Sequence, residues 1–218
     1  MYISYQHHSR TALFSLFIII ICFFILKITK LNFKKLNYAF YILIFCVVFI
    51  TYFYINIKNF YFYDFLNGFS HSVFGKSLDS HRPFLWSESL NILNWWQYLI
   101  GAGTGKLPEL IRFKNSSFHN TYLQLFIQNG IFGLVILIIL FKKIWNLIID
   151  NEIDDMLYFV ISIFIGIIIY NCYETTLLQN KTFLGIIEWL TLGIGYQCII
   201  FYKNDFIKNE GEYNEKIY

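Results

Sequence analysis

The chain has 218 residues, of which 57% are hydrophobic, 22% are aromatic and only 14% are charged. Soluble domains carry about 25% charged residues, so this composition excludes an ordinary water-soluble enzyme and favours a membrane protein. The net charge of +3 is modest and lies partly in lysines that flank apolar runs, so it gives no indication of nucleic-acid binding.

Five apolar runs predict helices that cross a membrane, because about 20 such residues span the hydrocarbon core. They extend over residues 11–26, 36–57, 122–141, 156–170 and 183–202. The alternative, five buried core helices of a soluble protein, would leave no amphipathic shell to face water. We therefore expect an all-α, polytopic membrane protein in which residues 1–218 form a single membrane domain.

The connection between the first two runs contains the densest basic cluster in a short loop, formed by Lys27, Lys30, Lys34 and Lys35. Cytoplasmic loops carry an excess of lysine and arginine, so this connection is expected to lie inside the cell. The large loop, residues 58–117, is then expected to lie outside. Under the same assignment Lys142 and Lys143 also fall inside, which makes the orientation self-consistent.

Neither cysteines nor clustered acidic residues indicate a cofactor. The four cysteines lie in or beside separate predicted spans and show no metal-ligand spacing, so we interpret them as apolar fillers; they are Cys22, Cys46, Cys172 and Cys198. No group of His, Cys, Asp and Glu has the spacing of a metal site. The sequence therefore predicts neither a divalent metal nor another cofactor.

Residues 101–106 read GAGTGK and look like a phosphate-binding loop of a nucleotide hydrolase. The nucleotide motif requires a glycine five positions before Gly105 and a hydroxyl after the lysine. Ile100 and Leu107 occupy these positions, so ATP binding is not predicted. What remains is that a glycine-rich backbone can direct amides at an anion.

The segment before this loop predicts one amphipathic helix, residues 83–100. Its apolar stripe consists of Trp86, Leu90, Leu93, Trp96 and Ile100. Pro83 suits a first helical turn and Gly101 a helix end. Two readings stay open: a helix lying in the membrane interface, and a helix that packs under the loop.

Several short motifs occur in a recognisable order. They are SHRPFLWSESLNILNWWQYLIGAGTGK from Ser80, HNTYLQLFIQNGIFGL from His119, and Ser9-Arg10-Thr11-Ala12-Leu13 at the start of the first run. This series resembles the O-antigen ligase and O-antigen or capsular polysaccharide polymerase family. Members of that family are integral membrane enzymes that use undecaprenyl pyrophosphate-linked glycans.

The resemblance implies a glycosyltransferase in the cytoplasmic (inner) membrane of a bacterium. An acceptor sugar hydroxyl would attack the anomeric carbon of the lipid-linked glycan, and undecaprenyl pyrophosphate would leave. The implied partners are this glycan, the lipid bilayer, and a chain-length regulator or flippase of the same pathway. Family members usually have about twice this length, so the chain is expected to correspond to their C-terminal half.

Within this resemblance, arginine suits the pyrophosphate because its planar guanidinium donates two parallel hydrogen bonds and stays charged. Arg82 is the first candidate for binding the pyrophosphate and assisting its departure, and Arg10 is the second. Arg112 and Lys106, in the same large loop, would add positive charge. The alternatives are a headgroup-paired arginine for Arg82 and an outer-face anchor for Arg10.

His119 is the candidate general base, because imidazole titrates near neutral pH. Ser116 or Ser117 is predicted to cap the third span, which would place His119 in its first turn. The alternative is a helix-capping histidine at the membrane interface. Asn120 and Gly103 are assigned supporting roles, Asn120 as an orienting or capping group.

Two glutamates receive different interpretations. Glu188 lies inside the fifth run, where an ionisable group is costly and suggests function; it either bonds to a neighbouring helix or faces the glycan, and it is counted as a supporting residue. Glu174, in the last outer loop, is expected to be exposed.

Polymerase is favoured over ligase, although both share these motifs and differ in acceptor. An inactive remnant or a non-enzymatic membrane component of a polysaccharide locus is the main alternative. A small transporter is disfavoured, since no pair of broken helices or of mid-membrane charges is evident.

Overall fold

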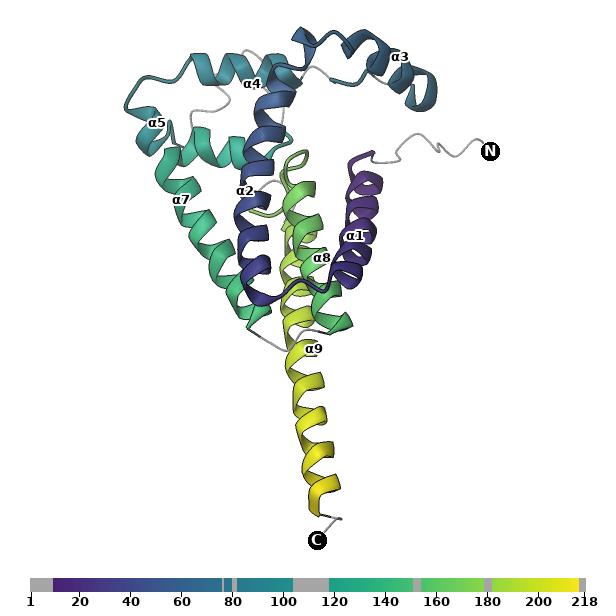
Figure 1. The fold of residues 1–218 in the computed structure, drawn as a ribbon. Coiled ribbons are helices and arrows are strands. Elements are labelled where there is room, and N and C mark those ends of the chain that lie inside the picture. Colours follow the sequence, from purple (N-terminus) through teal and green to yellow (C-terminus); the bar gives the residue numbers. More distant parts are fainter. Residues whose placement is uncertain are drawn as a thin grey trace. The chain divides into compact units, whose positions relative to one another are not determined.

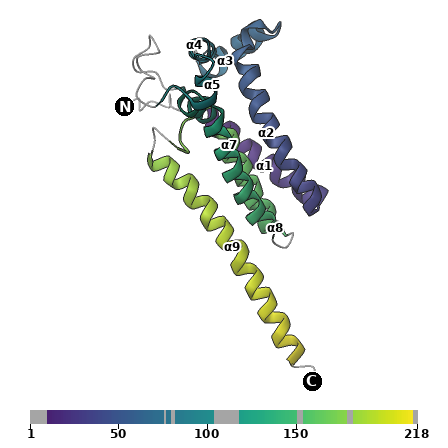
Figure 2. The same ribbon diagram turned by 90° about the vertical axis from the view of Figure 1, so that its left-hand side faces the viewer.

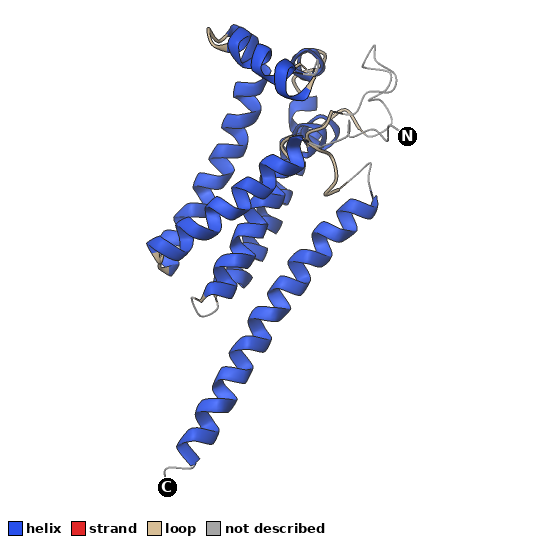
Figure 3. Ribbon diagram, turned by 90° about the vertical axis from the view of Figure 1, so that its right-hand side faces the viewer, coloured by secondary structure: helices blue, strands red, loops and turns tan. Residues whose placement is uncertain are grey.

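The structure, a computed structural model, describes residues 10–75, 77–79, 82–103, 118–150, 154–178 and 182–215. The side chains of residues 10, 74, 182 and 202–215 fall outside that description. Within these ranges every regular element is a helix (Figure 3), which confirms the all-α expectation. The chain forms two compact units. The first comprises Met1–Leu43, Ile139–Tyr170 and Lys181–Tyr218, and the second Ile44–Ile138 and Asn171–Asn180.

Figure 1 labels the helices in chain order. They are α1 (Arg10–Thr29), α2 (Phe33–Ile55), the short 3-10 helix η2 (Ile57–Asn59), α3 (Tyr63–Phe74), α4 (Arg82–Asn91), α5 (Gln97–Ile100), α7 (Thr121–Ile149), α8 (Asp155–Tyr170) and α9 (Thr182–Glu215). Helix α9 runs on as one continuous helix beyond its apolar part (Figure 2).

Four helices are long and apolar enough to cross a membrane, namely α1, α2, α7 and α9. They correspond to four of the five predicted spans. The other predicted span forms α8, an apolar helix of 16 residues. At 1.5 Å per residue it measures about 24 Å, less than the roughly 30 Å of a hydrocarbon core. The protein is therefore a multi-pass membrane protein, with α8 shorter than an ordinary span.

In the first unit, α1 packs along α8, and α8 also contacts α9. The approach of α1 and α8 depends on Gly166, since a Cβ there would lie 2.2 Å from Cγ1 of Ile19. The buried centre of this unit contains stacked and tilted rings: Trp145 lies 5.7 Å from Phe40 and 5.6 Å from Phe164 between ring centroids. Most other large side chains of α1 are exposed, as expected for a surface covered by lipid.

In the second unit, the chain changes direction inside α7. Gly130 has φ 64° and ψ −163°, a conformation essentially limited to glycine, and it separates residues 121–129 from residues 131–149. The first of these two segments and α4 surround an apolar core. The buried members of this core are Tyr54, Ile57, Leu85, Trp86, Leu93, Phe118, Leu123 and Ile127.

The predicted helix over residues 83–100 is wrong in its extent, because α4 ends at Asn91 and α5 begins only at Gln97. Between them the backbone N–H of Asn94 donates to the side-chain Oε1 of Gln97 at 2.8 Å, which replaces a helical hydrogen bond. The break lets Trp86 and Leu93 enter the core while Trp96 stays exposed. For α4, the packing-helix reading therefore holds.

The turn formed by Gly101, Ala102 and Gly103 crosses α7 at its kink. The N–H groups of Ala102 and Gly103 donate to the carbonyl oxygens of Ile127 and Gln128, at 2.8 and 3.1 Å. The N–H of Gly101 donates to the carbonyl of Gln97. The expectation that these amides face an anion is therefore wrong: they hold α5 against α7, and this is the supporting role of Gly103.

This crossing leaves no room for a side chain at either glycine. A Cβ at Gly130 would lie 2.2 Å from the carbonyl oxygen of Leu99, and one at Gly101 would lie 2.1 Å from that of Gln128. Both glycines also have positive φ angles. The two backbones thus meet where only glycine fits.

We expect Gly130→Ala to lower the free energy of unfolding by at least about 1–3 kcal/mol, from backbone strain alone. The steric overlap with Leu99 adds to this loss. The measurement is the melting temperature of the detergent-purified protein. Gly193→Ala, in α9, is the matched control because its Cβ would meet nothing within 4 Å. Equal melting temperatures for the two variants would contradict the crossing.

Candidate functional site

The first part of the site is the turn that precedes α7. His119 adopts a left-handed conformation with φ 48°, which histidine tolerates better than bulkier residues. Its neighbours are anchored on both sides. The carbonyl of Phe118 accepts a hydrogen bond from Nε1 of Trp86 at 2.8 Å. Asn120 is fully buried, and its Nδ2 donates to Oγ1 of Thr51 on α2 at 3.3 Å.

Asn120 also begins the helix. Its Oδ1 accepts the N–H of Leu123 at 2.8 Å, which is the hydrogen bond of a helix cap. The predicted capping residues Ser116 and Ser117 lie outside the described residues, and α7 begins at Thr121. His119 therefore lies before the helix and not in its first turn, which corrects that prediction. The capping role predicted for Asn120 is confirmed.

Arg82, the first residue of α4, supplies the cationic group of the site. Its Nη1 donates to the carbonyl of Tyr173 at 3.0 Å, and its Nη2 lies 4.0 Å from Oε1 of Glu174. Only 18% of the side chain is exposed. The backbone N–H of Arg82 donates to the carbonyl of Asp79 at 3.0 Å. Arg82 is thus enclosed by protein, which does not match the alternative of an arginine paired with lipid headgroups.

Glu174 joins the two predicted residues. Its Oε2 lies 3.1 Å from Nδ1 of His119, and its side chain is only 10% exposed. The expectation of an exposed Glu174 is therefore wrong. A run of polar residues in a short outer loop carries no periodicity, so the sequence contained no signal for this burial.

The burial of Glu174 results from how the loop after α8, residues 171–178, is fastened to α7. Oγ1 of Thr121 donates to Oδ1 of Asn171 at 2.6 Å and its N–H donates to the carbonyl of Asn171 at 2.9 Å. Oδ1 of Asn171 also accepts the N–H of Leu177 at 3.1 Å. One buried asparagine therefore closes the loop and holds it against the start of α7.

The contact between His119 and Glu174 determines which ring nitrogen carries the proton. An ionised carboxylate only accepts hydrogen bonds, so Nδ1 must be the donor. In that tautomer the lone pair of the ring lies on Nε2. The guanidinium of Arg82 compensates the buried charge of Glu174, as buried charges require. The arrangement can take up a proton at Nε2 and can bind an anion near Arg82.

The two neighbours of Glu174 in the chain have different properties. Burial raises the pKa of Cys172 to about 12, so its thiol stays protonated and is a poor nucleophile at neutral pH. Burial also raises the pKa of Tyr173. Neither group exchanges a proton readily near neutral pH, which leaves His119 and Glu174 as the proton-handling pair of this cluster.

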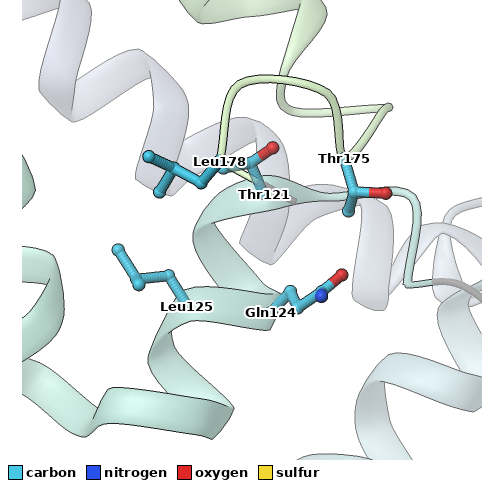
Figure 4. A pocket seen from close by; sticks show the side chains of 5 residues that line it. All are labelled: Thr121, Gln124, Leu125, Thr175 and Leu178. Carbon is cyan, nitrogen blue, oxygen red and sulfur yellow. The ribbon is translucent and has the colours of Figure 1, made fainter. Parts of the chain in front are cut away.

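A small cavity lies beside Glu174, between residues 121–129 and the loop. Figure 4 shows its lining side chains, which are Thr121, Gln124, Leu125, Thr175 and Leu178. Its volume of about 10 Å³ corresponds to one water-sized group. The cavity is therefore too small for a sugar ring.

The other predicted site residues do not join this cluster within the described part of the chain. Arg112 and Lys106 lie outside the described residues. Arg10 begins α1 and its side chain is not described, while Glu188 is a half-buried residue of α9. Both belong to the first unit, whereas Arg82, His119 and Glu174 belong to the second.

Comparison with known proteins gives one match. A family model described as O-Antigen ligase matches residues 5–138, a range that includes Arg82 and His119. No curated protein matches the chain, and no solved structure matches it. Because the matched residues make up more than half of the chain, this multi-pass membrane protein belongs to the O-antigen ligase family, and its role lies in surface polysaccharide synthesis.

Proposed function

We propose that the protein is a membrane glycosyltransferase that polymerises undecaprenyl pyrophosphate-linked oligosaccharide repeat units on the outer side of the cytoplasmic membrane. The observation that carries the proposal is the cluster in which Arg82 and His119 share Glu174. Pyrophosphate transfer chemistry needs both a fixed cation and a base. The membership in the O-antigen ligase family supports the class of substrate.

In the proposed reaction, a hydroxyl oxygen of the acceptor sugar forms a bond to the anomeric carbon of the donor glycan. The bond from that carbon to the pyrophosphate oxygen breaks, and its electron pair leaves with the pyrophosphate. Nε2 of His119 takes the hydroxyl proton. The reaction needs no oxidant or reductant, and each atom lost by the donor is found in the lipid pyrophosphate.

Arg82 has the role of binding the pyrophosphate and stabilising the charge that develops on it. A guanidinium fixed by Tyr173 loses little side-chain freedom when it meets the phosphate, since its orientation is already set. The arginine also stays charged at every working pH. Arg10, Arg112 and Lys106 would add positive charge around the same donor.

Glu174 has the role of holding both groups. It keeps the proton of His119 on Nδ1 and balances the charge of Arg82. Because it does not touch the reacting atoms in this scheme, it is a positioning residue. Asn120 supports the same arrangement from the other side, since its buried amide starts α7 directly after His119.

The orientation of the chain is part of the proposal. The lysine-rich turn between α1 and α2 favours the cytoplasmic side, so the opposite end of α2, which leads to η2 and α3, lies outside. The cluster would then face the compartment in which surface polysaccharide is assembled. A chain-length regulator or flippase of the same pathway is the proposed protein partner.

A chain-length assay tests the function directly. Cells that lack the gene are complemented with the wild-type chain, and their lipid-linked glycans and surface polysaccharide are separated by size. Loss of long chains with retained single repeats in the uncomplemented cells supports the polymerase. Loss of transfer to the lipid A core would instead identify a ligase. Unchanged glycans would sink both and favour a non-enzymatic component.

Glu174→Gln is expected to lower transfer by about 10- to 100-fold, since a hydrogen bond to a charged group contributes about 1.5–3 kcal/mol. The amide keeps the shape of the side chain but not its charge. The measurement is polymer formed per amount of protein in the membrane. Glu88→Gln, on α4, is the matched control because Glu88 lies on the same helix as Arg82. Equal activity of the two variants would refute the role of Glu174.

A further inference from the structure

Helix α3 has three distinct faces. One face meets the rest of the second unit, where Ser70 is buried and Oδ1 of Asn67 accepts the N–H of Leu78 at 2.8 Å. A second face is exposed and polar, with Asp64 and His71. The third is exposed and apolar. It consists of Phe62, Phe65, Phe69 and Val73, whose exposed fractions are 42%, 75%, 59% and 54%.

The spacing of these four residues, at i, i+3, i+7 and i+11, places them along one side of the helix. A rotation of 100° per residue puts His71 on nearly the opposite side from Phe62 and Val73. An exposed apolar face opposite an exposed polar face is typical of a helix that lies in a membrane interface.

The apolar face of α3 continues a surface that already faces lipid. On α2, the rings of Phe45, Phe49 and Phe53 stack at successive distances of 6.3 and 6.2 Å between centroids. Phe53 in turn stacks on Phe60 at 4.4 Å and lies 6.2 Å from Phe62. Phe45 and Phe49 are exposed side chains of a helix long and apolar enough to cross the membrane.

We infer that α3 lies in the bilayer interface, with Phe62, Phe65, Phe69 and Val73 among lipid acyl chains. The polar face with Asp64 and His71 then faces water. The occupant of the apolar face is the phospholipid bilayer, since the ring ladder leads from the lipid-covered side of α2 to the first turn of α3 without interruption. Helix α4, whose Trp86 is fully buried in protein, does not take this position.

The same contacts connect the depth of α3 to that of Arg82. Asp79 forms an ion pair with Lys58 at 2.8 Å, and this hydrogen bond and charge raise the pKa of Lys58. The carbonyl of Asp79 accepts both the phenol of Tyr54 and the N–H of Arg82, each at 3.0 Å. A helix held in the interface therefore holds Arg82 at a set distance from the headgroups. The value of that depth for a lipid-linked donor rests on the proposed function.

Photo-cross-linking tests the lipid contact without any need for activity. The photoreactive amino acid p-benzoylphenylalanine replaces Phe65 in one variant and Phe69 in a second, and the full chain is reconstituted in vesicles of phosphatidylethanolamine and phosphatidylglycerol. Irradiation is followed by mass spectrometry of the protein. Position 49, on the lipid side of α2, is the positive control, and position 71, on the polar face of α3, is the matched negative control.

We expect phospholipid adducts at positions 65 and 69 at yields comparable with that at position 49, and none at position 71. Adducts at position 49 but at neither 65 nor 69 would overturn the inference. So would cross-links at these positions that join two copies of the chain. Either result leaves the chain-length assay unaffected, so a failure here is distinguishable from a failure of the proposed function.

Discussion

Replacement of His119 by asparagine is expected to reduce glycan transfer by about 10²- to 10⁴-fold, the usual contribution of general acid–base catalysis. Asparagine tolerates the left-handed conformation of this residue, and its amide can still donate a hydrogen bond to Glu174. It cannot accept a proton from an acceptor hydroxyl. Transfer is measured as long-chain polymer per amount of protein in the membrane.

His119→Ala is also expected to abolish visible polymer while the protein stays in the membrane, but alanine adds strain at a positive φ. Comparison of the two variants separates this strain from the chemistry. His71→Ala is the matched control, because His71 is an exposed histidine of the same unit. Wild-type polymer from His119→Asn would exclude His119 as the base.

Arg82→Lys is expected to reduce transfer by about 10- to 100-fold, although the charge is kept. A lysine offers a single ammonium and cannot place two parallel N–H groups on a phosphate, and a lost charge-assisted hydrogen bond costs about 1.5–3 kcal/mol. The contact with the carbonyl of Tyr173, which orients the guanidinium, is lost as well. The same polymer assay, with the amount of membrane protein as reference, measures the effect.

A purely structural role of Arg82 is excluded by a paired variant. Arg82→Ala leaves the buried Glu174 without its cation, which costs on the order of 1–3 kcal/mol and is expected to lower the melting temperature. The double variant Arg82→Ala and Glu174→Gln removes both charges, so the melting temperature should recover while transfer stays low. Recovery of transfer together with stability would show that Arg82 acts only in folding.

Local patterns in the sequence were sufficient for the helices. Charge-free apolar runs predicted α1, α2, α7 and α9, because a helix in lipid must satisfy its backbone within the segment and needs only length and hydrophobicity. Local patterns failed where one residue interrupts a periodic run. Gly130 divides α7, and the hydrogen bond between Asn94 and Gln97 ends the helix predicted over residues 83–100.

The sequence by itself determined the membrane class, the helices, the family resemblance and two residues of the candidate site, Arg82 and His119. Only the tertiary structure decided that these two meet at Glu174. The contact with His119 joins residues 55 positions apart, and the hydrogen bond from Arg82 to Tyr173 joins residues 91 positions apart. Such pairs depend on how a loop is fastened, here by the buried Asn171, and no periodicity along the chain records that fastening.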